Sequence, residues 1–209
     1  MKIHPQHCNP STTCTTTSHP PIISNNNISS NREIFTLWMK SLILGGKGCT
    51  VFDSNGRVAY RVDNYGSKCC TKVFLMDCRG DVLLTIHRKK FWLLPRWAGY
   101  RDEKKKGESW LFHVRKCWKI TKKPLGCQVV VSLNHDKKSP VFKIEKGKTD
   151  LSSYKIVDRL GGLIAEMKRK QSGGVVLGDD VLTLVVEANV DHSLIMGLMV
   201  AYSLIHSRI

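Results

Sequence analysis

The stretch that most constrains the fold is residues 194–201, where each position is apolar or glycine. At the helical period of 3.6 residues, this stretch covers every side of two turns and leaves no face for water. Asp191 stands at the N-cap position in front of it. We therefore predict a C-terminal helix enclosed by the rest of the chain. Gly197 inside this helix predicts a strand or side chain crossing close by, because glycine otherwise disfavours a helix.

A membrane span or tail anchor is the alternative for this helix. The apolar stretch continues to Ile205, which at 1.5 Å per residue gives a length of about 18 Å. The hydrocarbon core of a bilayer is about 30 Å thick. The segment is therefore short for a membrane span, and the comparison favours a buried core helix.

From residue 35 onward, short apolar stretches alternate with clusters of Gly, Asn, Asp or Lys, a pattern typical of about a dozen strands. In residues 57–62, Val58, Tyr60 and Val62 fall on one face, and Arg57 and Arg61 fall on the other. This alternation is typical of a strand with one buried face and one solvent-exposed face. This favours a mainly antiparallel sheet. The clearest predicted strands are residues 57–62, 72–76, 82–87, 109–115, 128–132, 141–145, 154–158, 163–168 and 181–187.

Three hairpin turns share the pattern Asp-x-x-Gly-x-aliphatic, beginning at Asp53, Asp77 and Asp158. The aspartate side chain can accept a backbone N–H of the turn, and glycine at the fourth position takes the positive φ that reverses the chain. The pattern therefore predicts a structural role for these aspartates and no catalytic one.

Together these features predict a mainly β fold, a closed antiparallel barrel around a buried hydrophobic C-terminal helix. Closure removes exposed strand edges, and the helix fills an interior too wide for strand side chains alone. Residues 1–33, rich in Ser, Thr, Asn, His and Pro, predict a disordered polar arm. Residues 34–209 form the predicted folded domain.

Charge is the unusual part of the composition, with 33 Lys and Arg against 17 Asp and Glu and a net charge of +16. Residues 1–33 contain only Lys2, Arg32 and Glu33 as charged residues, so the excess belongs to the folded domain. A surface of this kind attracts polyanions. The candidate ligand-binding residues are Arg88, Lys89, Lys90, Arg96, Lys104, Lys105, Lys106, Lys168, Arg169 and Lys170.

We expect these clusters to bind acidic phospholipid headgroups such as phosphoinositides, with Trp92 or Trp97 at the membrane interface if exposed. The alternative for any single cluster is a structural role, in which charged side chains at strand ends keep loops hydrated and prevent strand edges from pairing with other chains. Nucleic-acid binding by the same surface is the rival function, although no DNA-reading helix is evident. Lipid scrambling is a third possibility, and it requires the C-terminal helix to face lipid.

Motifs of catalysis are missing from the sequence. It has no Gly-x-Ser-x-Gly, His-Glu-x-x-His or Cys-x-x-Cys, and residues 45–48 lack the phosphate-loop spacing. The N-terminal His and Cys residues match no zinc pattern. We therefore expect no enzymatic activity, cofactor or metal. Without a secretory leader we expect a reducing compartment, with Cys49, Cys78, Cys117 and Cys127 as small buried hydrophobes.

Two long segments resemble a known family. The first segment comprises residues 36–42, 48–56 and 60–65. The second comprises residues 176–180, 185–187 and 189–192, followed by the apolar helix. Over residues 35–209 the chain resembles the plant LURP-one-related proteins. The resemblance implies a tubby C-terminal-like barrel threaded by its last helix, and kinship with phospholipid scramblases and membrane-tethered tubby-like regulators.

The resemblance also implies a non-enzymatic role in plant signalling or defence. The expected location is cytoplasmic or peripheral at the plasma membrane, with a nuclear pool. Expected partners are phosphoinositides or an acidic membrane surface and proteins of defence signalling, with nucleic acid as the less favoured partner, and the chain is expected to be a monomer. The resemblance assigns no binding residue, because the phosphoinositide motif of tubby-like domains has no counterpart in this sequence.

Overall fold

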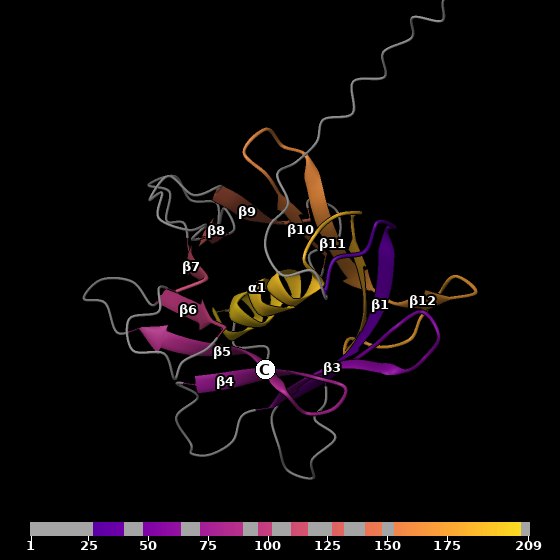
Figure 1. Ribbon diagram of the computed structural model, residues 1–209. Helices are drawn as coiled ribbons and strands as arrows, with labels where there is room; N and C mark the ends of the chain where they lie inside the picture. The colour runs from indigo at the N-terminus through magenta and orange to yellow at the C-terminus, as the bar shows by residue number, and fades with distance from the viewer. Residues whose placement is uncertain are drawn as a thin grey trace, which may run out of the picture.

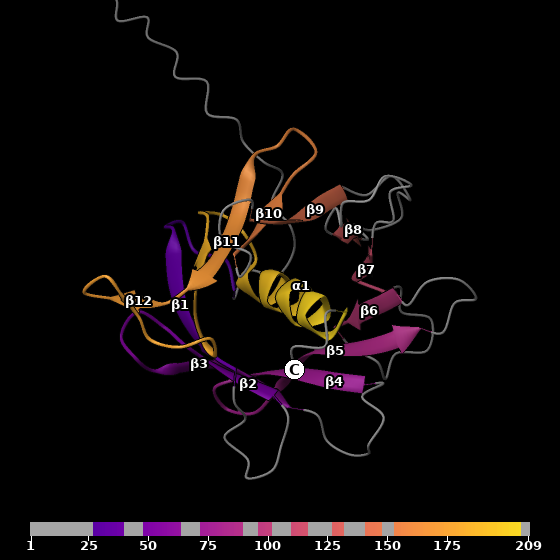
Figure 2. The same cartoon turned by 180° about the vertical axis from the view of Figure 1, so that it is seen from behind.

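The computed structural model describes residues 27–39, 48–63, 72–89, 96–101, 110–116, 127–131, 141–147 and 153–205 of the chain. In these residues, twelve antiparallel strands close into a barrel, and one helix, α1 (His192–Ile205), lies inside it (Figure 1). The predicted closed barrel around a C-terminal helix is therefore confirmed. Seen from behind, the wall again surrounds the helix (Figure 2).

Neighbours in the barrel are mostly neighbours in sequence, in the order β1-β14-β11-β10-β9-β8-β7-β6-β5-β4-β3-β2. The small hairpin β12–β13 lies outside the barrel, between β11 and β14 in sequence. The strands are β1 (Glu33–Trp38), β2 (Gly48–Phe52), β3 (Val58–Asp63), β4 (Lys72–Asp77), β5 (Val82–Lys89), β6 (Arg96–Tyr100), β7 (Phe112–Lys116), β8 (Cys127–Val131), β9 (Val141–Lys146), β10 (Tyr154–Val157), β11 (Leu163–Arg169), β12 (Gln171–Ser172), β13 (Val175–Val176) and β14 (Val181–Val186).

The two ends of the barrel differ, and the helix defines them. Because every neighbouring pair is antiparallel, β1, β3, β5, β7, β9 and β11 all finish at the same end. The C-terminal part of α1 lies there, since Tyr202 packs edge-on against Tyr154 at the start of β10, with 4.6 Å between ring centroids. We call this the helix-exit end. At the opposite end, His192 at the start of α1 contacts Phe35, with 5.3 Å between ring centroids.

The helix fills the barrel. Its residues from His192 to Ser203 are buried, and the space left between it and the wall beside Cys49 and Met196 is only about 10 Å³, roughly what one water molecule needs. The predicted close crossing at Gly197 is confirmed, because a Cβ there would stand 2.7 Å from Cδ1 of Leu84 and 3.0 Å from Cε1 of Phe112. The helix is therefore a packed core element.

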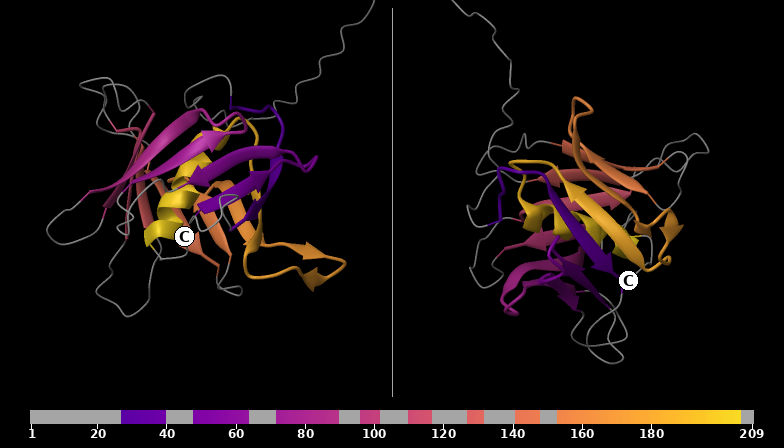
Figure 3. Two further views of the ribbon diagram at one scale, coloured as in Figure 1. Left: turned by 90° about the horizontal axis from the view of Figure 1, so that it is seen from below. Right: turned by 90° about the vertical axis from the view of Figure 1, so that its right-hand side faces the viewer.

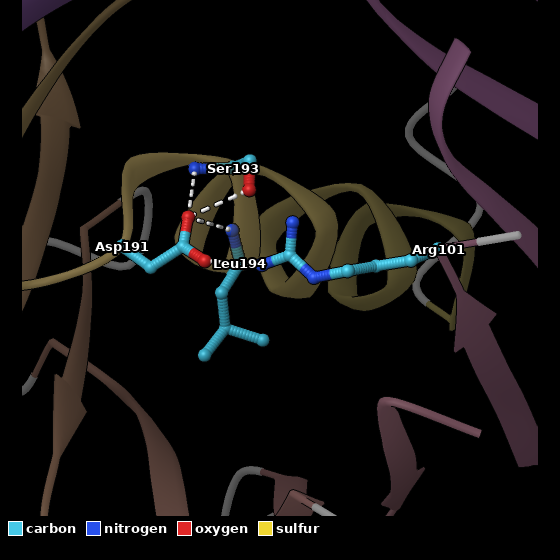
Figure 4. A network of polar contacts seen from close by, with 4 residues as sticks. All are labelled: Arg101, Asp191, Ser193 and Leu194. Atoms are coloured by element: carbon cyan, nitrogen blue, oxygen red, sulfur yellow. Dashed lines mark hydrogen bonds and ion pairs between the residues drawn. The ribbon is translucent and has the colours of Figure 1, made fainter. Parts of the chain in front are cut away.

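The start of α1 is held by a buried carboxylate (Figure 4). Oδ1 of Asp191 accepts the backbone N–H groups of Ser193 at 2.9 Å and Leu194 at 3.2 Å, as the predicted N-cap should. It also accepts the Ser193 hydroxyl at 2.6 Å. The other oxygen, Oδ2, pairs with the guanidinium of Arg101. Asp191 thus caps the helix and ties it to the end of β6.

The three predicted Asp-Gly turns are confirmed. In each, Oδ1 of the aspartate accepts the N–H groups two and four residues later, at 2.7 to 2.9 Å. The turn glycines Gly56, Gly80 and Gly161 have φ of 75°, 93° and 88°. All three turns lie at the end opposite the helix exit, since they join β2 to β3, β4 to β5 and β10 to β11.

The last residues of the predicted N-terminal arm lie against the folded domain. The backbone carbonyl of Ser29 accepts the N–H of Asn189 at 2.7 Å, and that of Asn27 accepts the N–H of His192 at 2.9 Å. Ile28 forms an isolated β-bridge with Asp191. This part of the arm therefore braces the turn before the helix. Residues 1–26 of the predicted arm lie outside the described residues.

Candidate polyanion-binding surface

The predicted ligand-binding residues that the structure describes lie on two opposite walls of the barrel but at the same end. Arg88 and Lys89 finish β5 and Arg96 begins β6, whereas Lys168 and Arg169 finish β11 and Lys170 follows it. In the barrel order, four strands separate β11 from β6 on the shorter path. All these positions belong to the helix-exit end. Lys90, Lys104, Lys105 and Lys106 lie outside the described residues.

Strand register brings three cations together on the outer wall. Lys89 of β5 is opposite Arg96 of β6, and Arg96 is opposite Arg115 of β7. Directly opposed residues point to the same face, and these alternate with buried Trp97 and Val114, which point inward. We call Lys89, Arg96 and Arg115 the basic row.

Aromatic and imidazole side chains lie beside the basic row. The ammonium of Lys89 is 5.2 Å from the ring centroid of Tyr100, within reach of a cation–π interaction. His113 lies against Trp110, with 4.0 Å between ring centroids. Burial, then the positive charges of Arg96 and Lys89, lower the pKa of His113 from 6.5 to about 4. The imidazole is therefore neutral at pH 7, and the charges of the basic row contribute to its low pKa after burial.

The sequence pattern does not predict this row, because residues 96–100 lack the features of a clear strand. Arg115 belongs to a separate basic pair of the sequence, outside the candidate ligand-binding residues, and its position opposite Arg96 follows only from the pairing of β6 with β7. Trp97 is not available for a membrane interface, because only 4% of this residue is exposed and it packs in the core. Trp92 lies outside the described residues.

The cluster at residues 168–170 is largely committed to contacts within the protein. Lys168 and Lys155 both pair with the carboxylate of Glu166, at 2.8 and 3.2 Å. Burial alone would raise the pKa of Glu166, but the hydrogen bonds and charges of these two lysines outweigh it and lower the pKa. Arg169 pairs with Asp179 at 3.1 Å, and Lys170 donates to the hydroxyl of Thr36 at 2.7 Å.

Charge is segregated between the two ends of the barrel. Among the described residues, acidic and basic side chains are nearly balanced in the turns and strand ends opposite the helix exit, where each of the three turn aspartates has an arginine in the same turn. The helix-exit end is predominantly basic, although Asp63, Glu145, Glu166, Asp179 and Asp180 also lie there. Its described cations are Lys72, Arg88, Lys89, Arg96, Arg115, Lys146, Lys155, Lys168, Arg169 and Lys170.

An open pocket of about 390 Å³ lies at the helix-exit end, where Ser203 approaches the end of β11. Its wall combines the apolar Met39 and Met167 with the paired Arg169 and Asp179. Among the described residues, no group of three or more His, Cys, Asp or Glu side chains is placed to hold a metal ion.

The described cysteines are of two kinds. Cys49 and Cys127 are buried free thiols, as expected. Burial is the larger cause and the negative charge of Asp63 the smaller one that together raise the pKa of Cys49 to about 12. The expectation of burial was wrong for Cys78, which is exposed in the turn between β4 and β5. That turn is built by Asp77 and Gly80, so the intervening position points into solvent.

Within the described ranges, no helix has both the length and the apolar character needed to cross a membrane.

Comparisons with known proteins identify the family. Residues 33–203 match the family described as LURP-one-related. Protein LURP-one-related 11 of Arabidopsis thaliana is 42% identical, with 99% of this chain and 89% of that protein covered. Protein LURP-one-related 3 of the same plant is 41% identical, covering 85% of this chain and 81% of the relative. A crystal structure of an Arabidopsis thaliana protein shares the fold, with a TM-score of 0.62 at 19% identity over 86% of this chain and 94% of that one. The chain belongs to the LURP-one-related family.

Proposed function

We propose that this protein is a non-enzymatic signalling or defence-related plant protein whose helix-exit end binds acidic phospholipid headgroups. Membership of the LURP-one-related family is consistent with a defence-related role. The observation that supports lipid binding best is the basic row, in which Lys89, Arg96 and Arg115 stand side by side on three adjacent strands. Their spacing on a rigid wall suits several phosphate groups at once.

The segregation of charge supports a membrane surface as the partner. A planar anionic surface attracts a protein most strongly when its cations face one direction, since each basic residue near the surface contributes about 1 kcal/mol. The described cations of the helix-exit end lie on two opposite walls but at one end, while each turn aspartate of the opposite end has an exposed arginine close by in the same turn. The opposite end has no comparable excess of basic residues among those described, so the helix-exit end would be the one to face the membrane.

The two rival functions have less support. Nucleic acid could use the same cations, but the helix in the described residues is buried and presents no residues to a groove. Insertion of the C-terminal helix into lipid would require α1 to leave the barrel and expose Leu198 and its buried neighbours. The basic row serves headgroup binding without such a change.

The test compares vesicle binding of two charge-matched variants. K89Q/R96Q/R115Q removes the basic row, and R57Q/R79Q/R159Q removes three exposed arginines at the opposite end. With vesicles of phosphatidylcholine containing phosphatidylserine or a phosphoinositide, we expect the first variant to lose about 100-fold in affinity. The control variant should lose far less, and neither should bind pure phosphatidylcholine strongly.

Two results would overturn the proposal. Equal losses in the two variants would mean that only net charge matters. Failure of the wild-type protein to bind acidic vesicles, together with tight and salt-dependent binding of DNA or RNA, would assign the basic row to nucleic acid.

A further inference from the structure

The hairpin β12–β13 projects from the barrel at the helix-exit end. Figure 3 shows it extending away from the barrel wall. Its base continues the sheet, since Leu177 donates to the carbonyl of Lys170 at 3.0 Å and Lys170 donates to that of Val181 at 2.9 Å. Its turn residues Gly173 and Gly174 have φ of 56° and 82°, and a Cβ on either would meet nothing within 4 Å. The tip is therefore free of the barrel.

The tip carries exposed aliphatic side chains. Val175, Val176 and Leu177 are 67%, 42% and 51% exposed. The whole stretch of residues 171–178 lacks charged side chains. Three consecutive exposed aliphatic residues on one projecting element are unusual for a soluble surface and mark an interaction site.

The arrangement of these side chains identifies the partner. Val175 and Val176 are consecutive in β13, so their side chains point to opposite faces of the hairpin. A protein surface or a second copy of the chain would cover one face and leave the other in water. A lipid phase surrounds the tip and covers both faces at once.

The surroundings of the hairpin suit the same partner. Lys168, Arg169 and Lys170 stand at its base, where phosphate headgroups would lie and would compete with Glu166 for Lys168 and with Asp179 for Arg169. Trp38 is opposite Val181 and 39% exposed, and tryptophan favours the membrane interface. In the hairpin, the polar residues Gln171 and Ser172 of β12 are opposite Val176 and Val175 of β13. These polar side chains limit insertion to a shallow depth. The hydrogen bonds between the two strands satisfy their backbone groups.

We propose that the β12–β13 hairpin inserts Val175 and Val176 into the acyl boundary of the membrane that the helix-exit end approaches, with Leu177 at the edge of this apolar contact beside Lys170. This inference rests on the proposed function and adds the element that penetrates the membrane. The basic row supplies attraction to acidic headgroups, and the hairpin supplies apolar contact on the opposite wall of the same end.

Depth-dependent quenching tests insertion directly. V176W places a fluorophore at the tip, and L160W places one at Leu160, which is 94% exposed in a turn at the opposite end. With acidic vesicles containing brominated phosphatidylcholine, we expect the added emission of V176W to be quenched and that of L160W to be unaffected. The wild-type protein gives the background of the native tryptophans.

A matched pair of variants tests the energetic role. V175S/V176S/L177S removes the apolar tip, and V82S/L160S/L163S removes three exposed aliphatic residues at the opposite end. We expect the first to weaken binding to acidic vesicles by about tenfold or more and the second to leave it unchanged. Circular dichroism and thermal unfolding establish that both variants remain folded.

The outcomes separate this inference from the proposed function. Vesicle binding by the wild-type protein without quenching of V176W overturns insertion and leaves headgroup binding intact. Quenching with equal binding to neutral and acidic vesicles supports insertion and overturns the requirement for acidic lipid. No binding to either vesicle overturns both. A shift of the lipid-free protein from oligomer to monomer in V175S/V176S/L177S would assign the tip to self-association and also overturn insertion.

Discussion

The ring of Phe112 lies so close to Gly197 that the helix and the barrel wall leave no room for a methyl group between them. A Cβ on residue 197 would stand 3.0 Å from Cε1 of this ring, and one on Gly99 of β6 would stand 2.3 Å from the same atom. Phe112 is thus held between a glycine of the wall and a glycine of the helix. Close packing of this kind transmits any added volume as strain.

We expect Gly197→Ala to destabilise the protein despite the better helix propensity of alanine. The clash with Phe112 and with Cδ1 of Leu84 should lower the free energy of unfolding by about 1–3 kcal/mol, measured by urea denaturation. In a double-mutant cycle, F112L/G197A should lose less than the sum of the single variants, because leucine frees space beside residue 197. A G197A protein more stable than the wild type would contradict this packing.

Asp191 performs two tasks that substitution can separate. Its side chain is fully buried, and it caps α1 while pairing with Arg101. Asp191→Ala loses both interactions, and we expect a loss of about 3 kcal/mol or more in the free energy of unfolding. Asp191→Ser keeps a capping oxygen without the charge and should recover about 1 kcal/mol. Chemical denaturation measures both, and equal stability of the two variants would show that the cap contributes nothing.

The depressed pKa of His113 predicts a pH dependence of stability. Its pKa in the folded protein is about 4, against an ordinary value of 6.5. As pH falls through this window, the unfolded chain takes up a proton that the folded protein does not, so the free energy of unfolding falls. His192, whose pKa burial also lowers, acts in the same direction. His113→Gln should flatten the profile between about pH 6.5 and 4, measured by denaturation at each pH.

A polyanion on the basic row should raise the pKa of His113. The positive charges of Arg96 and Lys89 contribute to its depression, and bound phosphate groups would offset them. We expect the imidazole resonance of His113 to titrate at higher pH when inositol hexakisphosphate is added. The assignment follows from the signal lost in His113→Gln. Binding without any change in this titration would place the ligand away from the basic row.

Glu166 restrains two lysines that could otherwise face lipid. It pairs with Lys155 and Lys168 near the base of the hairpin. If this wall approaches the membrane, Glu166→Gln releases both cations and removes a negative charge, and binding to acidic vesicles should strengthen about two- to fivefold. Glu145→Gln removes an acid of the neighbouring wall, paired with Lys143, and provides the matched comparison. An equal gain in both variants would show only an effect of net charge.

The sequence by itself determined the architecture. The apolar stretch at residues 194–201 has no polar face, so it had to be enclosed, and the strand periods and Asp-Gly turns supplied the wall that encloses it. These are local signals, in which spacing along the chain sets which face of an element meets water. The N-cap at Asp191 and the close crossing at Gly197 could be predicted for the same reason.

Only the tertiary structure decided which basic residues of β5, β6 and β7 lie side by side. Lys89 and Arg96 already lie in one basic stretch of the sequence, but Arg115 is distant from both and joins them only through the register of β6 and β7. Packing and strand pairing also bury Trp97, place residues 168–170 on the far wall and bring Lys155 of β10 opposite Glu166 of β11. Register and closure are set by packing over the whole barrel, and composition does not specify them.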